Sequence, residues 1–566
     1  MSLFEVFPLL SDAAASELGA YGPYLQTLLF NRGITTKAEA ETFLSPSYET
    51  QLHDPFLLHD MDKAVERVLL AIKANQKTII YSDYDCDGIP GAVVLHDFFT
   101  AAGYTNFFVH IPHRHYDGFG LSVKAVETLK AEQSPDLIIT IDCGTTDIEA
   151  VAKARELGID VIITDHHEPK DTLPEAVAVV NPKVGTTYPF DGLCGAAVIF
   201  KLVQALIARG DFAITPGQEK WWLDMVGIAT IADMVPLRDE NRVLAHYGLT
   251  VLRKSRRPGL QQLLRKQKAS QSHLTEDDIG FTIGPRINAA SRMDTPEDAF
   301  FLLATKDEGE AGARLIHLEK LNTDRKSAVS QMTKELHVRM KTIEELPDVL
   351  VMGNADWRPS LAGLAANKLA EEYNRPAFLW GRDGNGVFKG SCRSGGGVSV
   401  VKLMNAVPEF FHEFGGHHMS GGFSVRDEHI HTLAAGLQDA YTKLGAEAAI
   451  VEPLLVDMEI TLDNITSELV RAQRQCGPFG CENHKPLYLI QNVTPREVVA
   501  FGKAKEHTKL VFATTGLTKE AIAFFKAPEQ FSKVPSIDTP LSLLAHLEES
   551  FFMGRLQTRL RIVDII

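Results

Sequence analysis

The amino-acid sequence predicts a multidomain α/β protein with a small β-barrel in its C-terminal part. Its 566 residues exceed what one hydrophobic core normally holds, which favours about three or four domains. Between residues 59 and 235, helix-period stretches alternate with short β-branched runs, the pattern of a parallel sheet with helices on both faces. From about residue 450, strand-like segments surround one helix-like stretch, which fits a barrel of about 110 residues.

The first region gives the clearest alternation of elements. Its helix-like segments carry apolar residues at helical spacing, and its strand-like segments are short and rich in Ile and Val. Ligands of such sheets collect at the carboxyl ends of the strands, so the residues that follow each strand are of interest. Helices are expected at 61–74, 91–103, 122–131 and 146–158, and strands at 77–81, 107–111, 136–141 and 160–164.

A long helix is expected to connect this region to the next. Residues 310–345 contain no proline and no glycine after Gly312. A helix of that length would span about 50 Å, more than one domain needs. A second α/β unit follows to about residue 445, with a glycine-dense interruption at 381–397. The predicted division of the chain is 1–45, 46–305, 306–345, 346–447 and 448–566.

Composition and charge narrow the class of protein. The chain is 45% hydrophobic and 23% charged, and no apolar run approaches the roughly 20 residues that cross a bilayer. The first residues lack the Lys/Arg-led region of a signal peptide, so we expect a cytoplasmic protein without a membrane partner. The six cysteines form no C-x-x-C pair, which excludes a four-cysteine zinc site. A net charge of −16 argues against nucleic-acid binding by the whole surface but leaves room for a local groove.

Three aspartates at alternate positions follow the first predicted strand. Asp83, Asp85 and Asp87 precede Gly88, which is how a helix-loop-helix calcium loop begins. That loop needs a bidentate Glu at its twelfth position, where this chain has Val94. A calcium loop is therefore excluded, and the aspartates need another explanation.

Further metal-binding residue types end the neighbouring strands. One strand ends in Asp142 and another in Asp165, His166 and His167, while Asp233 lies in the apolar stretch 225–237. Several buried carboxylates repel each other unless a cation lies among them. Capping of the following helices is an alternative for any single aspartate, but it does not account for three in five residues. The candidate metal ligands are Asp83, Asp85, Asp87, Asp142, His166 and Asp233.

Oxygen ligands with a little imidazole favour Mn²⁺ or Mg²⁺ over zinc, and the His favours Mn²⁺. The set is large enough for two ions about 3.5 to 4 Å apart, the arrangement that activates water in phosphoester hydrolysis. The simplest division gives Asp85 and Asp87 to different ions, with Asp83 shared or behind them. His167, beside His166, is a candidate donor to a phosphoryl oxygen, and a histidine without a catalytic role is the alternative.

Basic residues recur in glycine-containing segments elsewhere. Arg114 lies in "IPHRHYDGFGLS", Arg286 and Arg292 lie in "GPRINAASRMD", and Arg393 lies in "KGSCRSGGG". Arg binds phosphate in a bidentate way, so these are candidate phosphate contacts, with surface ion pairs as the alternative. His417, in "FGGHHMSGGF", is either part of a glycine turn or a side chain delivered into a phosphate cleft.

Nine motifs in order resemble the DHH phosphoesterase superfamily, and within it the RecJ family of single-strand-specific exonucleases. They are "DYDCDG", "IPHRHYDGFGLS", "IDCGTTD", "TDHHEP", "NPK", "LCGAAVIFKL", "IADMVPLRDENR", "GPRINAASRMD" and "FGGHHMSGG". The resemblance covers nearly the whole chain. It implies an N-terminal leader (1–45), a catalytic DHH domain (46–305), a connecting helix (306–345), a DHHA1 domain (346–447) and a nucleic-acid-binding OB-fold (448–566).

The resemblance also implies roles for the candidate residues. The six metal ligands named above would form the metal shell, with Mn²⁺ or Mg²⁺ as the cofactor. The catalytic residues would be His167, Asp165 and, from the DHHA1 domain, His417. The contacts to the 5′ phosphate and the DNA strand would be Arg114, Arg286, Asn288, Arg292, Ser391 and Arg393.

The implied activity is 5′-to-3′ exonuclease action on single-stranded DNA in recombination and repair. A helicase and a single-strand-binding protein are partners that the resemblance leaves open. One alternative is a small-substrate DHH phosphodiesterase acting on oligoribonucleotides or cyclic dinucleotides. Another is a non-catalytic relative that lost its metals, which would have substituted aspartates.

The chain departs from the family pattern in places. Ser291 stands at a usual glycine, Arg358 or Pro359 stands where a family His would be, and "IPGA" and "QCGPFGCENHKP" are altered. None of these changes removes a metal ligand. The resemblance therefore implies hydrolysis, while the altered positions lie among the residues expected to hold the substrate. In the tail, Phe501, Phe512, Phe524 and Phe525 are candidates either for the barrel core or for base stacking.

Overall fold

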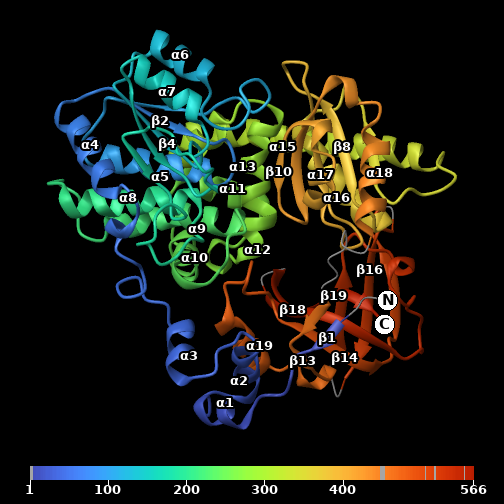
Figure 1. Ribbon diagram of the computed structural model, residues 1–566. Helices are drawn as coiled ribbons and strands as arrows, with labels where there is room; N and C mark the ends of the chain where they lie inside the picture. Colours follow the sequence, from blue (N-terminus) through green and yellow to red (C-terminus); the bar gives the residue numbers. More distant parts are fainter. Residues whose placement is uncertain (1–3, 446–452, 504, 515–517, 553–554) are drawn as a thin grey trace.

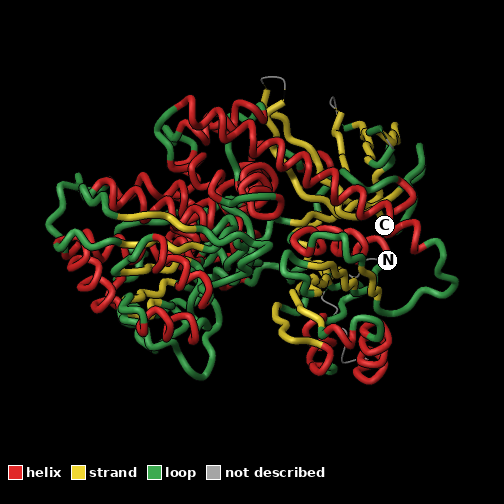
Figure 2. Tube along the Cα trace, turned by 90° about the horizontal axis from the view of Figure 1, so that it is seen from above, coloured by secondary structure: helices red, strands yellow, loops and turns green. Residues whose placement is uncertain are grey.

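The computed structural model describes residues 4–445, 453–503, 505–514, 518–552 and 555–566. Figure 1 shows three parts: a first domain that holds the N-terminal parallel sheet, a second α/β domain, and a C-terminal module below them. The long helix α15 runs between the first and second domains (Figure 1), and Figure 2 shows the whole chain from above with helices, strands and loops in different colours.

The first domain is built on five parallel strands in the order β3-β2-β4-β5-β6. The central strands are buried along their whole length, because helices cover both faces of the sheet. Helices α4, α5 and α8 cover one face and α6 and α7 the other. The elements are α4 (Met61–Lys73), β2 (Thr78–Ser82), α5 (Gly88–Ala101), β3 (Phe107–His110), α6 (Val123–Glu132), β4 (Leu137–Ile141), α7 (Ile148–Glu156), β5 (Asp160–Thr164), β6 (Ala178–Val180) and α8 (Gly195–Arg209). The predicted parallel sheet is confirmed.

A group of helices extends the first domain toward the second. Helix α15 has 33 residues, about 50 Å, and packs against α11, α13 and α14 at one end and α16 at the other. It lies within the residues expected for a connecting helix. The helices are α9 (Leu223–Ala232), α10 (Asp239–Leu252), α11 (Pro258–Gln267), α12 (Glu276–Asp278), the π-helical turn η4 (Ile279–Ile283), α13 (Gly284–Met293), α14 (Glu297–Ala304) and α15 (Glu308–Met340).

The second α/β domain has a mixed sheet in the order β10-β11-β9-β8-β7. Only β7 and β8 run parallel, and the other neighbours are antiparallel. Helix α16 packs on β8 and β9, which places its first turn beside the first domain. The elements are β7 (Leu350–Gly353), α16 (Pro359–Tyr373), β8 (Ala377–Arg382), β9 (Phe388–Arg393), α17 (Val400–Asn405), β10 (Phe411–Gly416), β11 (Ser420–Val425) and α18 (Leu433–Leu444).

The C-terminal module is a seven-stranded sheet in the order β13-β14-β18-β19-β17-β16-β15. Its apolar core includes Phe512, whereas Phe525 is 81% exposed, so the four phenylalanines of the sequence prediction do not share one role. The elements are β12 (Leu454–Val456), β13 (Met458–Glu459), α19 (Ser467–Cys476), β14 (Leu487–Val493), β15 (Glu497–Phe501), β16 (His507–Ala513), β17 (Thr518–Ala523), β18 (Leu541–Phe552) and β19 (Arg555–Ile565).

The N-terminal leader belongs to this C-terminal module in space. Strand β1 (Phe4–Val6) pairs in parallel with β12, and the first helices pack against α19 (Figure 1). Leu18, Leu28 and Leu29 are fully buried in the shared apolar cluster. The leader helices are α1 (Asp12–Glu17), α2 (Pro23–Phe30) and α3 (Lys37–Leu44).

A buried arginine joins this module to the first domain. The guanidinium of Arg242, on α10, donates to the carbonyl oxygens of Phe43, Cys476 and Gly477. A second tie is the ion pair between Lys485 and Asp277 of α12, at 2.6 Å. Within the described residues, no helix is both long and apolar enough to cross a membrane.

Candidate metal centre

Three neighbouring strands of the parallel sheet end at the same place. Asp83, Asp85 and Asp87 follow β2, Asp142 follows β4, and the Asp165–His167 segment follows β5. Asp233 arrives from the C-terminal end of α9. The structure therefore brings together all six candidate ligands at the carboxyl edge of the sheet, where ligands of such folds bind.

The loop after β2 is held by backbone contacts on both sides. The Asp83 amide donates to the carbonyl of Ile141, and Asp85 Oδ1 accepts from the amides of Asp87 (2.8 Å) and Gly88 (3.3 Å). Gly88 leaves no room for a side chain, since a Cβ there would lie 2.4 Å from the Asp83 carbonyl oxygen. The tight turn into α5 thus fixes the spacing of the three aspartates.

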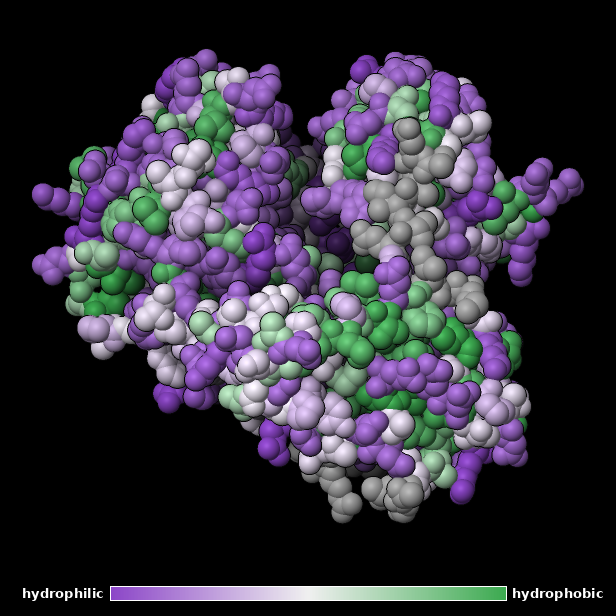
Figure 3. Space-filling model, turned by 60° about the horizontal axis from the view of Figure 1, so that its bottom comes forward, coloured by the Kyte–Doolittle hydropathy of each residue, from purple (hydrophilic) through white to green (hydrophobic). Residues whose placement is uncertain are grey.

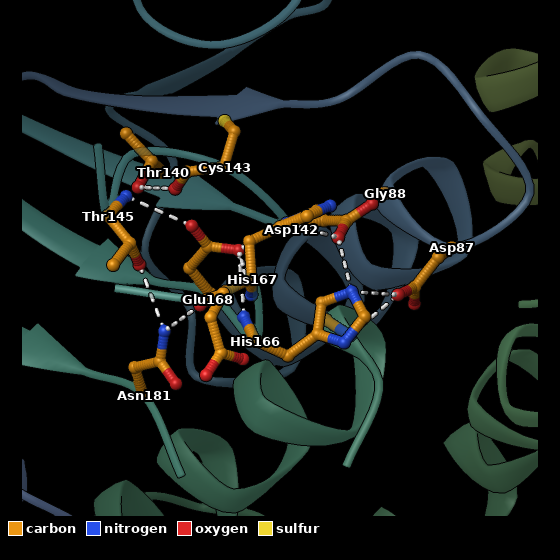
Figure 4. Close-up of polar contacts among 12 residues, drawn as sticks. Asp87, Gly88, Thr140, Asp142, Cys143, Thr145, His166, His167, Glu168 and Asn181 are labelled. Carbon is orange, nitrogen blue, oxygen red and sulfur yellow. Dashed lines mark hydrogen bonds and ion pairs between the residues drawn. The ribbon is translucent and has the colours of Figure 1, made fainter. Parts of the chain in front are cut away.

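Asp87 combines helix capping with the metal site. Its two carboxylate oxygens accept from the amides of Gly195 (2.6 Å) and Ala196 (2.7 Å) at the start of α8. The capping alternative therefore holds for Asp87, although the helix that it caps is not the one that follows it in sequence. The same carboxylate is 3.7 Å from His166 Nε2, so capping orients it toward the centre (Figure 4).

Ligand atoms fall into overlapping groups in which all lie within 4.8 Å of one another. One group is Asp83, Asp85 and Asp142, a second is Asp87, His166 and Asp233, and a third is Asp142, His166 and His167. The first two groups separate Asp85 from Asp87, as the sequence suggested. Asp142, rather than Asp83, is shared by two groups, the first and the third.

The carboxylates repel one another. Burial, and next the neighbouring carboxylates, raise the pKa of Asp83 and Asp142 well above their usual range, that of Asp87 to about 7 and that of Asp233 to about 9. Oδ1 of Asp83 and Oδ1 of Asp142 are buried without a hydrogen-bond partner. Buried acceptors of this kind need a cation, and a set of mostly oxygen donors with one imidazole fits Mn²⁺ or Mg²⁺.

The two histidines differ in protonation. Burial, and next the charge of His167, lower the pKa of His166 to about 3, so that it stays neutral and can act as a ligand. Its Nε2 lies 3.2 Å from Asp142 Oδ1. Burial opposes charge on His167 too, but the hydrogen bond from its Nδ1 to Asp165, at 2.8 Å, raises the pKa of His167 to about 9.

Asp165 orients the centre from behind. Its Oδ1 accepts from the amide of His166 and from His167, and its Oδ2 accepts from the Thr145 amide at 2.9 Å. Asn181 completes the scaffold by donating to Thr145 Oγ1 and to the His167 carbonyl (Figure 4). Asp165 thus positions the His167 ring and the loops that carry His166 and Thr145, and its part in catalysis stays a prediction. Asn181 lies in the "NPK" motif quoted above, but nothing in the sequence assigned it or Thr145 a contact.

Several arginines near the centre lack acidic partners. Arg114 stacks on Tyr84, which stands between Asp83 and Asp85, with 4.8 Å from Cζ to the ring centre. Burial, then Arg114 and Arg325, lower the pKa of Arg292 to about 9, so these cations lie close together. In the described parts of the chain none of the three forms an ion pair with a carboxylate. Arg325, on α15, has a buried Nε without a partner, and no sequence motif pointed to this residue.

The other predicted phosphate contacts lie at α16. Arg292 donates to the Ser360 carbonyl in the first turn of that helix. A Cβ at Gly363, one turn on, would lie 2.8 Å from Arg393 Nη2 and 3.3 Å from Ser391 Cβ. Arg292, Ser391 and Arg393 therefore gather around the N-terminal half of α16.

Two residues predicted to contact the DNA strand, Arg286 and Asn288, make packing contacts within the protein. The guanidinium of Arg286 donates to Glu319, Gln267 and the Thr282 carbonyl, and the residue is 7% exposed, so three of its five N–H groups serve packing and its contact with DNA stays a prediction. Asn288 Oδ1 accepts from the Cys86 amide at 3.0 Å and so anchors the aspartate loop. The sequence could not show these partners, because they come from α11, α15 and the loop after β2.

Within the described residues, His417 makes no hydrogen bond, ion pair or ring contact with the candidate metal ligands, and its catalytic role stays a prediction. It stands in the exposed turn between β10 and β11, where its amide donates to the Ser420 carbonyl at 2.7 Å. Gly416, with φ of 136°, would place a Cβ 2.3 Å from the same carbonyl oxygen, so the glycine-turn interpretation fits this segment.

Comparison with known proteins places this geometry in a family. Residues 77–230 match the DHH family N-terminal domain, residues 346–443 the DHHA1 domain, and residues 456–564 the RecJ OB domain. The single-stranded-DNA-specific exonuclease RecJ of Bacillus subtilis is 33% identical over 96% of this chain and 68% of its own length. The chain belongs to the RecJ family. The RecJ protein of Salmonella typhimurium is 32% identical over 82% of this chain and 83% of its own.

Solved RecJ structures share the architecture. RecJ from Thermus thermophilus in complex with Mn²⁺ superposes with a TM-score of 0.81 at 26% identity, covering 99% of this chain and 79% of that one. An exonuclease RecJ bound to manganese matches with a TM-score of 0.58 at 30% identity, covering 68% of this chain and 95% of that one. The predicted combination of DHH, DHHA1 and OB domains is confirmed.

Proposed function

We propose that this RecJ-family chain hydrolyses single-stranded DNA from its 5′ end with two Mn²⁺ or Mg²⁺ ions, in DNA recombination and repair. The observation that carries the proposal is the pair of ligand groups joined by the 3.2 Å contact between Asp142 Oδ1 and His166 Nε2, with arginines that lack acidic partners beside them. Relatives named as single-stranded-DNA-specific exonucleases extend over the metal centre and the OB domain. The small-substrate alternative has no such support.

The residues have separable tasks in this reaction. Asp83, Asp85 and Asp142 would hold one ion, and Asp87, His166 and Asp233 the other. The bound ions would lower the pKa of a water and neutralise charge on the phosphate. His167 keeps its ring proton at neutral pH, because Asp165 holds Nδ1, and Nε2 remains free to donate to a phosphoryl oxygen.

The arginines would bind the DNA backbone. Arg114 and Arg292 lie near the aspartate loop, and Arg393 lies across α16 from Arg292. A buried cation without a counter-ion is costly, and a phosphate supplies the missing charge. The 5′ phosphate and the first internucleotide phosphates are the natural partners of these three arginines. His417 remains a predicted contact from the DHHA1 domain.

A single-strand digestion tests the proposal. With Mn²⁺, we expect the wild-type protein to release mononucleotides from a 5′-phosphorylated, 3′-labelled strand, progressively from the 5′ side, and to act far more slowly on blunt duplex. Asp142→Ala should release nothing. Equal rates on both DNAs, or unchanged release by the variant, would refute the function.

The cellular setting remains a set of predictions. A helicase would supply single strands, and a single-strand-binding protein would present them, which co-purification with the wild-type chain under low salt can check. The cytoplasmic location predicted from sequence is checked by fractionating cells that express the tagged chain.

A further inference from the structure

A surface loop of the first domain runs along the metal centre. Residues 113–119, here called the strap, connect β3 to α6. At one end Arg114 stacks on Tyr84 of the aspartate loop, and at the other Phe119 meets the ring of His167, with 5.2 Å between ring centres. Phe119 is half exposed, so its outer face is free to touch a ligand.

The middle of the strap contacts the second domain. The Gly384 amide donates to the His115 carbonyl at 3.1 Å, and Asn385 Nδ2 donates to the Tyr116 carbonyl at 2.9 Å. Both donors lie in the tight turn between β8 and β9. The Tyr116 ring lies against Gly384, where a Cβ would stand 2.4 Å from the ring carbons. These contacts, here called the latch, join residues 269 positions apart.

The latch adds a bridge between the domains to those made by α15 and by Arg292 with Ser360. Helix α15 packs on α13 in one domain and on α16 in the other. Figure 3 shows that the molecule is hollowed between its two upper lobes and that the hollow is lined by hydrophilic residues. The strap thus contacts Tyr84 and His167 at the metal centre and the β8–β9 turn of the second domain.

We propose that the strap and the β8–β9 turn close a passage over the metal centre, and that the latch retains a single strand there between successive cuts. This inference rests on the proposed exonuclease function. Gly384 and Asn385 touch no ligand atom of the centre, and they act by holding the strap, so they are positioning residues. Retention slows dissociation of the strand and leaves the hydrolytic step unchanged.

The test separates retention from chemistry. Asn385→Ala removes one latch donor, and Gly384→Ala forces the Tyr116 ring away from the turn. We measure the number of nucleotides released per binding event on a long single strand, with excess unlabelled strand as a trap. We expect runs about fivefold shorter for Asn385→Ala, the effect of one neutral hydrogen bond on an equilibrium, shorter runs for Gly384→Ala through the displaced ring, and the shortest for the pair. The turnover number on a 5′-phosphorylated dinucleotide should stay at the wild-type value, because so short a substrate needs no retention.

A matched control comes from the same domain. Asn367 is exposed on α16 and its amide bonds only to Glu371 of the same helix. Asn367→Ala should keep wild-type runs. The inference is overturned if the latch variants keep wild-type runs, or if dinucleotide turnover falls in step with run length. Failure of the wild-type protein to degrade single strands would instead refute the exonuclease function.

Discussion

Asp142 has a left-handed backbone, with φ of 61°, at the end of β4. Gly195 packs directly against it, and a Cβ at Gly195 would lie 2.5 Å from Asp142 Cβ. The carboxylate is thus placed by strained local geometry and by a helix start that only glycine permits. Backbone strain of this kind persists where it serves a function. Here it places the Asp142 carboxylate in two of the groups of ligand atoms.

Asp142→Asn should separate stability from activity. The amide keeps the shape but lowers the negative charge that a cation needs, so we expect single-strand hydrolysis to fall by about 10³-fold or more. Without metal the variant should unfold at or above the wild-type temperature, because one buried like charge is gone. Thermal unfolding with a chelator and with Mn²⁺ measures both effects. A wild-type rise in unfolding temperature on Mn²⁺ addition that persists in the variant would contradict the assignment.

The metal-free protein should lose stability as pH rises. An unfolded Asp titrates near pH 4, whereas the native pKa is about 7 for Asp87 and about 9 for Asp233. The native state therefore binds more protons than the unfolded state between these values, and the free energy of unfolding falls with increasing pH. We expect a loss of several kcal/mol between pH 5 and about 8, measured by urea unfolding with a chelator. Saturating Mn²⁺ should reduce this slope, and a flat metal-free profile would contradict the prediction.

Arg325→Gln should weaken binding of the strand rather than hydrolysis. Its buried Nε has no partner in the protein, so a phosphate is the group most able to satisfy it. We expect KM for single-stranded DNA to rise about tenfold with kcat nearly unchanged. The plot of log binding constant against log salt concentration should become shallower by about 0.7, the share of one phosphate contact. Arg314→Gln is the matched control, since Arg314 lies on the same helix and pairs with Asp298. Equal effects of the two changes would remove the case for a phosphate contact.

At the scale of elements, α13 and the loop after β2 form one unit. Asn288, near the middle of α13, accepts from the Cys86 amide between Asp85 and Asp87. Asn288→Ala should therefore raise the Mn²⁺ concentration needed for half-maximal activity by about 10- to 100-fold, as removal of a group behind metal ligands commonly does. Asn288→Asp keeps the acceptor and should be milder. A metal titration that leaves the half-saturation point unchanged would show that α13 does not position the loop.

Sequence patterns predicted the elements better than their contacts. The strands and the aspartates behind them follow from alternation and from residue type, both of which are local. Two partners of Arg286 are not local: Gln267 comes from α11 and Glu319 from α15, so the motif alone could not show the packing network that holds its guanidinium. The positioning role of Asp165 was equally hidden in the sequence. Its carboxylate accepts four hydrogen bonds, and these depend on the turn after β5 and on Thr145.

At the scale of the whole molecule, the leader and the C-terminal module depend on each other. Leu28, on α2, is fully buried in a cluster completed by Ala472, Cys476 and Phe479. Leu28→Ala should lower the stability of this module by about 2 to 5 kcal/mol, the usual cost of such a cavity. Limited proteolysis should detect it as faster cleavage of the C-terminal part, while hydrolysis of a dinucleotide stays normal. If dinucleotide hydrolysis falls together with the stability of the C-terminal part, the module is not independent of the catalytic domain. No sequence pattern predicted that the leader packs on the C-terminal module, because the apolar faces of α2 and α19 do not show which helix covers them.

The place of the leader has a consequence for synthesis on the ribosome. Strand β1 finds β12 and helix α2 finds α19 only after some 450 further residues have been made. At about 5 to 20 residues per second, the nascent leader presents its apolar face for roughly 20 to 90 s before its partner emerges. During that interval the DHH domain can fold alone behind it. Folding in the cell should therefore draw on chaperones that shield the first helices until translation is complete.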